Sequence, residues 1–202
     1  MDERFWIEIG ISALIAFAAT FAGVYLGFWK ERRRADVEER DEFGRLLQGL
    51  LVESSNNYSI LTNLQNRVRP GAVSTDELYT DALQVALGSP LFYRKAGHSL
   101  VLAARLVRTQ LGTMNNVLSL YREGAAGGRL MTAHDVRGVQ IRAETSREVI
   151  RVMQGLLDAT MAELGAAVVA DAPLREVNER LAEIFRKERE TLERLDKQGS
   201  VG

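Results

Sequence analysis

The run IGISALIAFAATFAGVYLGFW, residues 9–29, contains no charged side chain. A helix rises about 1.5 Å per residue, so this run reaches roughly 30 Å, which is the thickness of the hydrocarbon core of a bilayer. Aromatic side chains, which favour the headgroup region, stand at both ends: Phe5 and Trp6 before the run, and Tyr25, Phe28 and Trp29 at its end. The sequence therefore predicts a transmembrane helix over residues 9–28, within an N-terminal anchor of residues 1–29.

Basic residues predict the direction of this helix. Before it the chain offers Arg4, whereas a cluster follows directly after it, made of Lys30, Arg32, Arg33 and Arg34. Because basic flanks stay on the cytoplasmic side, we expect a single-pass protein of the cell inner membrane with its N-terminus outside and its C-terminal part cytoplasmic. The cluster is also expected to contact lipid headgroups. A cleavable signal peptide and an inverted topology are less favoured alternatives, because a signal peptide has its basic flank in front.

Small residues line one face of the predicted span. At 100° per residue the bulky Phe17, Phe21, Val24 and Phe28 fall on the other side. Small side chains let two helices approach closely, and Gly23 and Gly27 form a GxxxG pattern, so we predict self-association through this face, although such patterns also occur by chance. The predicted packing stripe consists of Ser12, Ala16, Ala19, Gly23 and Gly27.

Glu8 lies at the outer end of this stripe. An acid in or near the membrane is a functional-site hypothesis by default, because a charge in hydrocarbon is unfavourable. The alternative is that Glu8 reaches the headgroups and stays solvated, since it stands only one turn from the end of the span.

The rest of the chain, residues 30–198, is expected to form an all-α, antiparallel bundle of four long helices and one short helix, followed by a disordered tail at 199–202. Arg69-Pro70-Gly71, the capping pattern Ser74–Glu77, Ser89-Pro90, the run Gly124–Gly128 and Pro173 set the breaks. The predicted helices are 30–68, 75–87, 90–122, 133–170 and 173–197.

Apolar periodicity supports these helices. The clearest coiled-coil pattern alternates spacings of three and four through Val136, Val139, Ala143, Ser146, Ile150, Met153, Leu157, Thr160 and Leu164. A similar face runs through Phe43, Leu47, Leu50, Ser54, Leu61, Leu64 and Val68, where the polar stretch Ser54–Ser59 interrupts it. We expect that stretch to be solvated rather than a buried polar layer. Glu188 interrupts the apolar stripe of the last helix.

The sequence offers little for chemistry. It has no cysteine and two histidines, His98 and His134, which are far apart and have no acid cluster at metal-ligand spacing. The run Gly124–Gly128 lacks the Lys-Ser/Thr of a phosphate loop, and the carboxylates of the last helix belong to a solvated face. We therefore expect no catalytic residue, no cofactor and no metal. A net charge of −1 makes nucleic acid an unfavoured partner.

These patterns predict a non-enzymatic, membrane-anchored helical scaffold or interaction protein, which contacts membrane lipids, self-associates as a homo-oligomer and binds a protein partner of unknown identity. An alternative is a membrane-acting effector of the toxin or bacterial immunity type, whose bundle senses a signal and clusters the transmembrane helices to permeabilise the bilayer. A second alternative is a cytoplasmic ligand-sensing bundle, which would need a pocket between helices.

Overall fold

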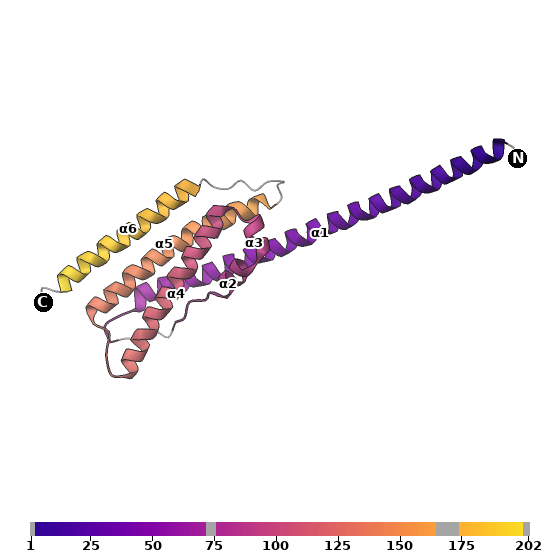
Figure 1. Ribbon diagram of the computed structural model, residues 1–202. Coiled ribbons are helices and arrows are strands. Elements are labelled where there is room, and N and C mark those ends of the chain that lie inside the picture. Colours follow the sequence, from indigo (N-terminus) through magenta and orange to yellow (C-terminus); the bar gives the residue numbers. More distant parts are fainter. Residues whose placement is uncertain (1–2, 72–75, 165–173, 200–202) are drawn as a thin grey trace. The chain divides into compact units, whose positions relative to one another are not determined.

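The structure is a computed structural model that describes residues 3–71, 76–164 and 174–199, with side chains from Phe17 onward. The described residues form six helices and no strand, so the predicted all-α class is confirmed (Figure 1). The chain divides into two compact units, Met1–Glu42 and Phe43–Gly202, which are described separately. The helices are α1 (Glu3–Arg67), α2 (Asp81–Gly88), α3 (Pro90–Lys95), α4 (His98–Ala126), α5 (Ala133–Glu163) and α6 (Leu174–Gly199).

The first unit consists of the N-terminal part of α1. Its side chains from 17 to 42 are exposed, except that of Glu39, which is half-buried. Within the part of the chain that the structure describes, no helix is long and apolar enough to cross a membrane. The described residues therefore give no support to the predicted transmembrane helix, whose residues 9–16 lie outside the described side chains.

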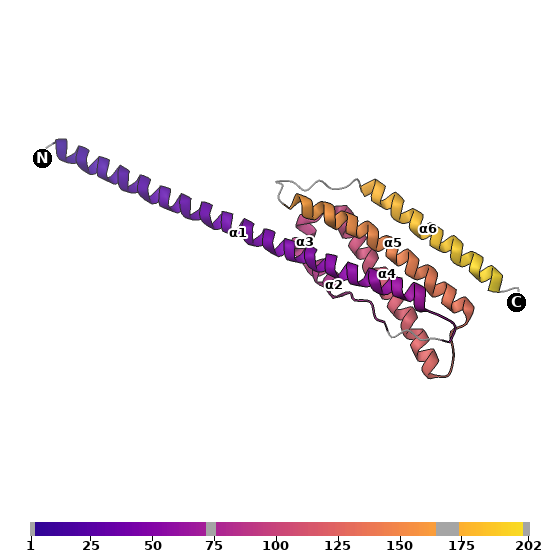
Figure 2. The same ribbon diagram turned by 180° about the vertical axis from the view of Figure 1, so that it is seen from behind.

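The second unit is a helical bundle. Helix α5 packs against α4 and α6, and α2 and α3 pack on α4 (Figures 1 and 2). The part of α1 after Phe43 joins α5, where the Gln140 side chain donates to the backbone carbonyl of Gln65 at 3.3 Å. The face of α5 that the sequence predicts is buried from Val136 to Thr160, and Leu164 is half-buried. This packing confirms the helical bundle.

One predicted helix is broken in the structure. The sequence predicts a single helix over 90–122, but α3 ends at Lys95 and α4 begins at His98, because Ala96 and Gly97 are extended with ψ near 139° and 155°. The bend keeps Phe92 and Leu100 buried on both sides of it. His98 is consequently the first residue of α4, whereas the predicted helix 90–122 placed it inside a helix.

The predicted helix 75–87 begins later than expected. Residues 72–75 lie outside the described residues, 76–80 are not helical, and α2 begins at Asp81. The proposed cap at Ser74–Glu77 therefore does not start α2. Its end at Gly88 agrees with the sequence. The physical reason for the late start is that residues 78 and 79 are hydrogen-bonded to side chains of α1 and α4, as described below.

The connection between α4 and α5 combines a C-terminal and an N-terminal cap. Helix α4 continues to Ala126, and Gly128 adopts a φ of 84°, which favours glycine. The backbone N–H of Arg129 donates to the carbonyl of Gly124 at 2.8 Å, and that of Gly128 to Ala125 at 2.9 Å, which is a Schellman motif. Thr132 and Asp135 then form a capping box at the start of α5.

Helices α5 and α6 overlap the predicted ranges 133–170 and 173–197. Helix α5 ends at Glu163, and residues 165–173, which include the predicted end at 170, lie outside the described residues. In α6, Val177 and Leu181 are buried, and Glu183 pairs with Lys187 at 3.4 Å and Glu190 with Arg194 at 4.0 Å. Such exposed pairs contribute about 0–1 kcal/mol each. Residues 200–202 of the predicted tail also lie outside the described residues.

Candidate functional site

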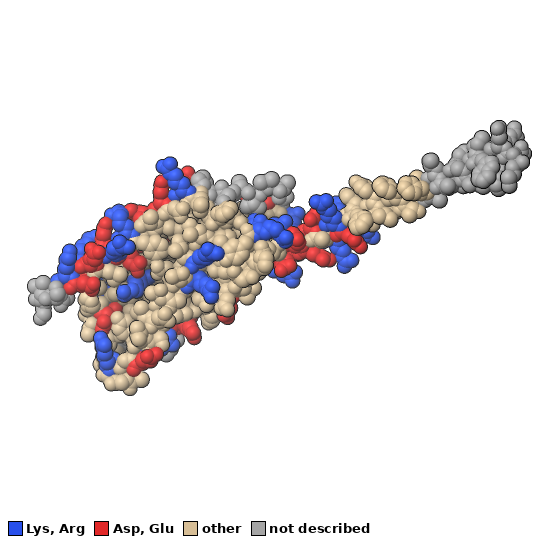
Figure 3. All heavy atoms as spheres, viewed as in Figure 1, with Lys and Arg blue, Asp and Glu red and all other residues tan. Residues whose placement is uncertain are grey.

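The largest run of exposed apolar side chains lies in α1. The run from Phe17 to Trp29, called here the apolar segment, has no charge and is apolar on every side of the helix. Figure 3 shows it as uncharged surface followed by a band of charged residues. A helix that is apolar all round is typical of a buried or membrane-embedded element, so this surface requires a cover. Its large exposed members are Phe17, Phe21, Val24, Tyr25, Leu26, Phe28 and Trp29.

Part of the predicted packing stripe lies in this segment. Ala19, Gly23 and Gly27 are exposed, and a Cβ added at either glycine would meet no described atom within 4 Å. The small-residue face is therefore open to an approaching helix. The other predicted members, Ser12 and Ala16, lie outside the described side chains.

Glu8 also lies outside the described side chains, so its proposed role is untested.

The predicted basic cluster is exposed at the end of the apolar segment. The Arg33 guanidinium lies 5.3 Å from the centre of the Trp29 ring, and Arg34 Nε donates to Glu38 at 3.0 Å. Lys30 and Arg32 are likewise exposed. An aromatic ring beside a guanidinium at the end of an apolar helix matches the side chains that anchor helices at a membrane interface.

The bundle contains a buried polar layer, which includes two residues of the stretch Ser54–Ser59 that was expected to be solvated. Ser54 and Asn57 are buried, and the Asn57 amide makes two hydrogen bonds to the backbone of Tyr79, one to its N–H (2.8 Å) and one to its C=O (2.7 Å). From α4, Asn115 pairs in the same way with the backbone of Leu78 (3.0 and 2.8 Å). The side chains of two asparagines thus satisfy the backbone N–H and C=O groups of residues 78 and 79, which are not helical.

Glu53 completes this arrangement at the start of α2. Its two carboxylate oxygens accept from the backbone N–H groups of Ala82 (2.6 Å) and Leu83 (3.1 Å). These N–H groups belong to the first turn of α2, whose own N-cap residue Thr80 makes no side-chain cap bond. Glu53 therefore acts as a cap supplied by another helix, where the helix dipole favours its negative charge.

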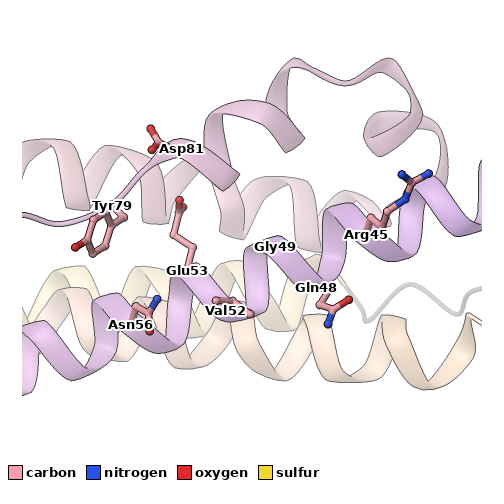
Figure 4. A pocket seen from close by; sticks show the side chains of 8 residues that line it. All are labelled: Arg45, Gln48, Gly49, Val52, Glu53, Asn56, Tyr79 and Asp81. Atoms are coloured by element: carbon pink, nitrogen blue, oxygen red, sulfur yellow. The ribbon is translucent and has the colours of Figure 1, made fainter.

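A cavity of about 450 Å³ lies beside Glu53 (Figure 4). Glu53 reaches from α1 toward the first turn of α2, where Asp81 lies, and Arg45 stands at the other end of the cavity. Both oxygens of Glu53 accept hydrogen bonds from the first turn of α2, so this carboxylate holds the start of that helix beside the cavity. The remaining lining residues are Gln48, Gly49, Val52, Asn56 and Tyr79.

A second polar cluster joins α1 to α5. The Tyr58 ring lies 4.9 Å from the guanidinium of Arg147 and 5.2 Å from that of Arg151, and both arginines donate to its hydroxyl. The hydrogen bond from Arg147 lowers the pKa of Tyr58, and Arg151 adds to this effect against the opposing effect of burial. Arg147 also donates to Gln65. The cluster fixes the register of α1 against α5.

Two further cavities lie along α4. One, of about 370 Å³, is formed by the end of α4, the connection that follows and the start of α5. In it Tyr121 donates to Asp135 at 3.2 Å. Burial, together with the nearby Asp135, raises the pKa of Tyr121. The other cavity, of about 500 Å³, lies between α2 and α4 and contains Arg105 and Arg108.

His134 lies beside a carboxylate of the last helix. His134 Nε2 lies 3.4 Å from Asp196 of α6, and both side chains are exposed. Among the described residues, no group of three His, Cys, Asp or Glu side chains is placed to hold a metal ion. No family model matches the chain, and no curated protein or solved structure shows significant similarity to it.

Proposed function

We propose that this chain is a single-pass, membrane-anchored helical interaction protein, with residues 9–28 in the inner membrane, the N-terminus outside and the bundle in the cytoplasm. The observation that carries the proposal is the apolar segment, which none of the described residues covers. Burying a large apolar side chain is worth about 1.5–3 kcal/mol, so leaving this segment in water is unfavourable. Hydrocarbon covers all sides of a helix at once, and the basic cluster then lies at the headgroups.

Self-association is the second part of this proposal. Among the described residues nothing packs on Gly23 or Gly27, so the small-residue face is available to a second copy of the helix. In lipid, helices associate through close packing and not through the hydrophobic effect, and such packing needs small side chains at the contact. The bundle would then present its exposed helices to a protein partner, without catalysis.

The stoichiometry of the purified chain tests this proposal. We would measure the mass of the full-length protein in mild detergent by sedimentation, comparing wild type with the double variant Gly23→Leu and Gly27→Leu. Two added leucines obstruct the close approach, so the oligomer should dissociate to monomer. Ala18→Leu also enlarges a small side chain, but on another face of the helix, and should leave the oligomer intact. A monomeric wild-type protein would contradict self-association, and a soluble protein that needs no detergent would contradict the anchor.

A further inference from the structure

The cavity at the end of α4 has the composition of a small-ligand site. It measures about 370 Å³, within the range of ligand pockets, and apolar side chains form much of its wall. Leu120 and Leu130 line it although 66% and 61% of their surfaces are exposed. The other lining residues are Val117, Tyr121, Gly124, Arg129, Asp135 and Arg142.

The charges in this cavity are not balanced. The Asp135 carboxylate already accepts three hydrogen bonds, from the backbone N–H and hydroxyl of Thr132 (both 2.9 Å) and from the hydroxyl of Tyr121 (3.2 Å). Burial opposes the ionised form of Asp135, but these hydrogen bonds outweigh it and lower its pKa. The charge of Asp135 is thus stabilised by the hydrogen bonds that hold the start of α5.

The two arginines of the cavity act on carboxylates only through their charge. Arg129 contributes to lowering the pKa of Asp135, and Arg142 opposes the rise that burial causes in the pKa of Glu188 in α6. Within the described residues, neither Arg129 nor Arg142 forms an ion pair or a side-chain hydrogen bond. A planar guanidinium matches a carboxylate with two parallel hydrogen bonds. The cavity therefore offers two cationic donors next to an apolar wall, with one carboxylate that is already satisfied.

Two capping motifs hold the backbone beside the cavity. The Schellman motif at Gly128 ends α4, and the capping box of Thr132 and Asp135 starts α5 three residues after Arg129. Both motifs hold the short connection by backbone hydrogen bonds. A backbone that is already held in place loses little conformational entropy on binding, which favours affinity for a small molecule.

We propose that this cavity binds a small amphipathic monocarboxylate, with its carboxylate on Arg129 and Arg142 and a compact apolar body against Leu120 and Leu130. The sum of two arginines and one aspartate leaves one positive charge in the lining, which a monoanion neutralises. This site is independent of the membrane anchor, because every residue that lines it belongs to the bundle.

Photolabelling of the full-length protein tests this site. The protein would be held in nanodiscs of neutral phosphatidylcholine and irradiated with 4-benzoylbenzoate, a water-soluble aromatic carboxylate, and the labelled peptides would be mapped by mass spectrometry. Label should concentrate on the peptides that carry Leu120 and Leu130. The matched neutral probe 4-benzoylbenzamide should label them about tenfold less at equal concentration, because a charged hydrogen-bonded pair is worth at least that factor.

Two arginine variants and one control complete the test. Arg142→Gln and the exposed Arg129→Gln should each reduce labelling by the carboxylate about tenfold. Arg137→Gln removes an exposed charge of the same helix outside the cavity and should leave labelling unchanged. The proposal is overturned if the amide labels as well as the carboxylate, if label spreads evenly over the helices, or if the variants at 129 and 142 behave like the control. Arg129 is exposed in the connection between α4 and α5, so Arg129→Gln should fold normally. Its labelling therefore tests the site even if Arg142→Gln unfolds.

Discussion

Replacing Asn57 by aspartate tests the buried polar layer. The amide of Asn57 is fully buried, donates to the carbonyl of Tyr79 at 2.7 Å and accepts from its N–H at 2.8 Å. Aspartate keeps the acceptor but places a carboxylate oxygen against the Tyr79 carbonyl when it is ionised. Only the protonated acid has a hydrogen to donate there. The folded state therefore raises the pKa of the new carboxyl above its unfolded value of about 3.9.

The sign and size of the effect follow from this shift. Each unit by which the folded pKa is raised destabilises the ionised folded protein by about 1.4 kcal/mol, so a shift of two units corresponds to roughly 3 kcal/mol at neutral pH. Below about pH 4 both states are protonated and this penalty disappears. The stability deficit of Asn57→Asp should therefore grow as pH rises from about 4 to 7. Asn57→Ala loses both hydrogen bonds and should show a deficit of about 1–3 kcal/mol that does not change with pH.

Urea unfolding of the full-length protein measures these deficits. Both tryptophans, Trp6 and Trp29, lie before residue 43, so far-UV circular dichroism is the appropriate signal for the bundle. Asn56→Asp is the matched control, because Asn56 is the exposed neighbour of Asn57 and its change should stay within about 0.5 kcal/mol. The proposed pairing with Tyr79 is refuted if Asn57→Asp is as stable as Asn56→Asp at neutral pH. It is also refuted if the stability deficit of Asn57→Asp is the same at about pH 4 and pH 7.

Three further predictions concern helix ends and the last helix. Gly128→Ala should destabilise the bundle by about 1 kcal/mol because of its φ of 84°, whereas Gly155→Ala, at an exposed helical position with open space, should stabilise it by about 0.5–1 kcal/mol in urea unfolding. Burial raises the pKa of the half-buried Glu188, so Glu188→Leu should raise the unfolding temperature at neutral pH, and the exposed Glu179→Leu should leave it nearly unchanged. Asp135→Asn should lose about 0.5–2 kcal/mol at neutral pH, and the loss should vanish as pH falls through the lowered folded pKa of Asp135.

Periodicity predicts the core of this protein well, because a helix repeats its contacts every three or four residues. Ser54 and Asn57 also lie on the alternating spacing that joins Leu50 to Leu61, and both are buried. Their polarity led to the expectation of a solvated stretch, which is wrong for Ser54 and Asn57 but holds for the exposed Ser55, Asn56 and Ser59. The spacing was the better guide, because the hydrogen bonds to Tyr79 and from Gln154 compensate for burial of these polar groups.

Long-range partners explain what the sequence does not reveal. The start of α2 depends on Glu53 and the extended residues before it on Asn57 and Asn115, all far away along the chain, so the local capping pattern at Ser74–Glu77 misleads. The bend at Ala96 and Gly97 likewise has no strong local signal, since Phe92, Ala96 and Leu100 keep helical spacing across it. The cavity at the end of α4 depends on how α5 packs, which no single helix encodes.

Cysteine accessibility tests the membrane anchor most directly, because the chain has no cysteine of its own. Single variants Asp2→Cys, Phe21→Cys and Ser55→Cys would be expressed in cells and treated with a membrane-impermeant maleimide. The account predicts labelling of Asp2→Cys in intact cells, of Ser55→Cys only after the membrane is opened, and of Phe21→Cys only after detergent is added. Labelling of Phe21→Cys without detergent, in protein recovered from the soluble fraction, would contradict the claim that the apolar segment lies in a bilayer.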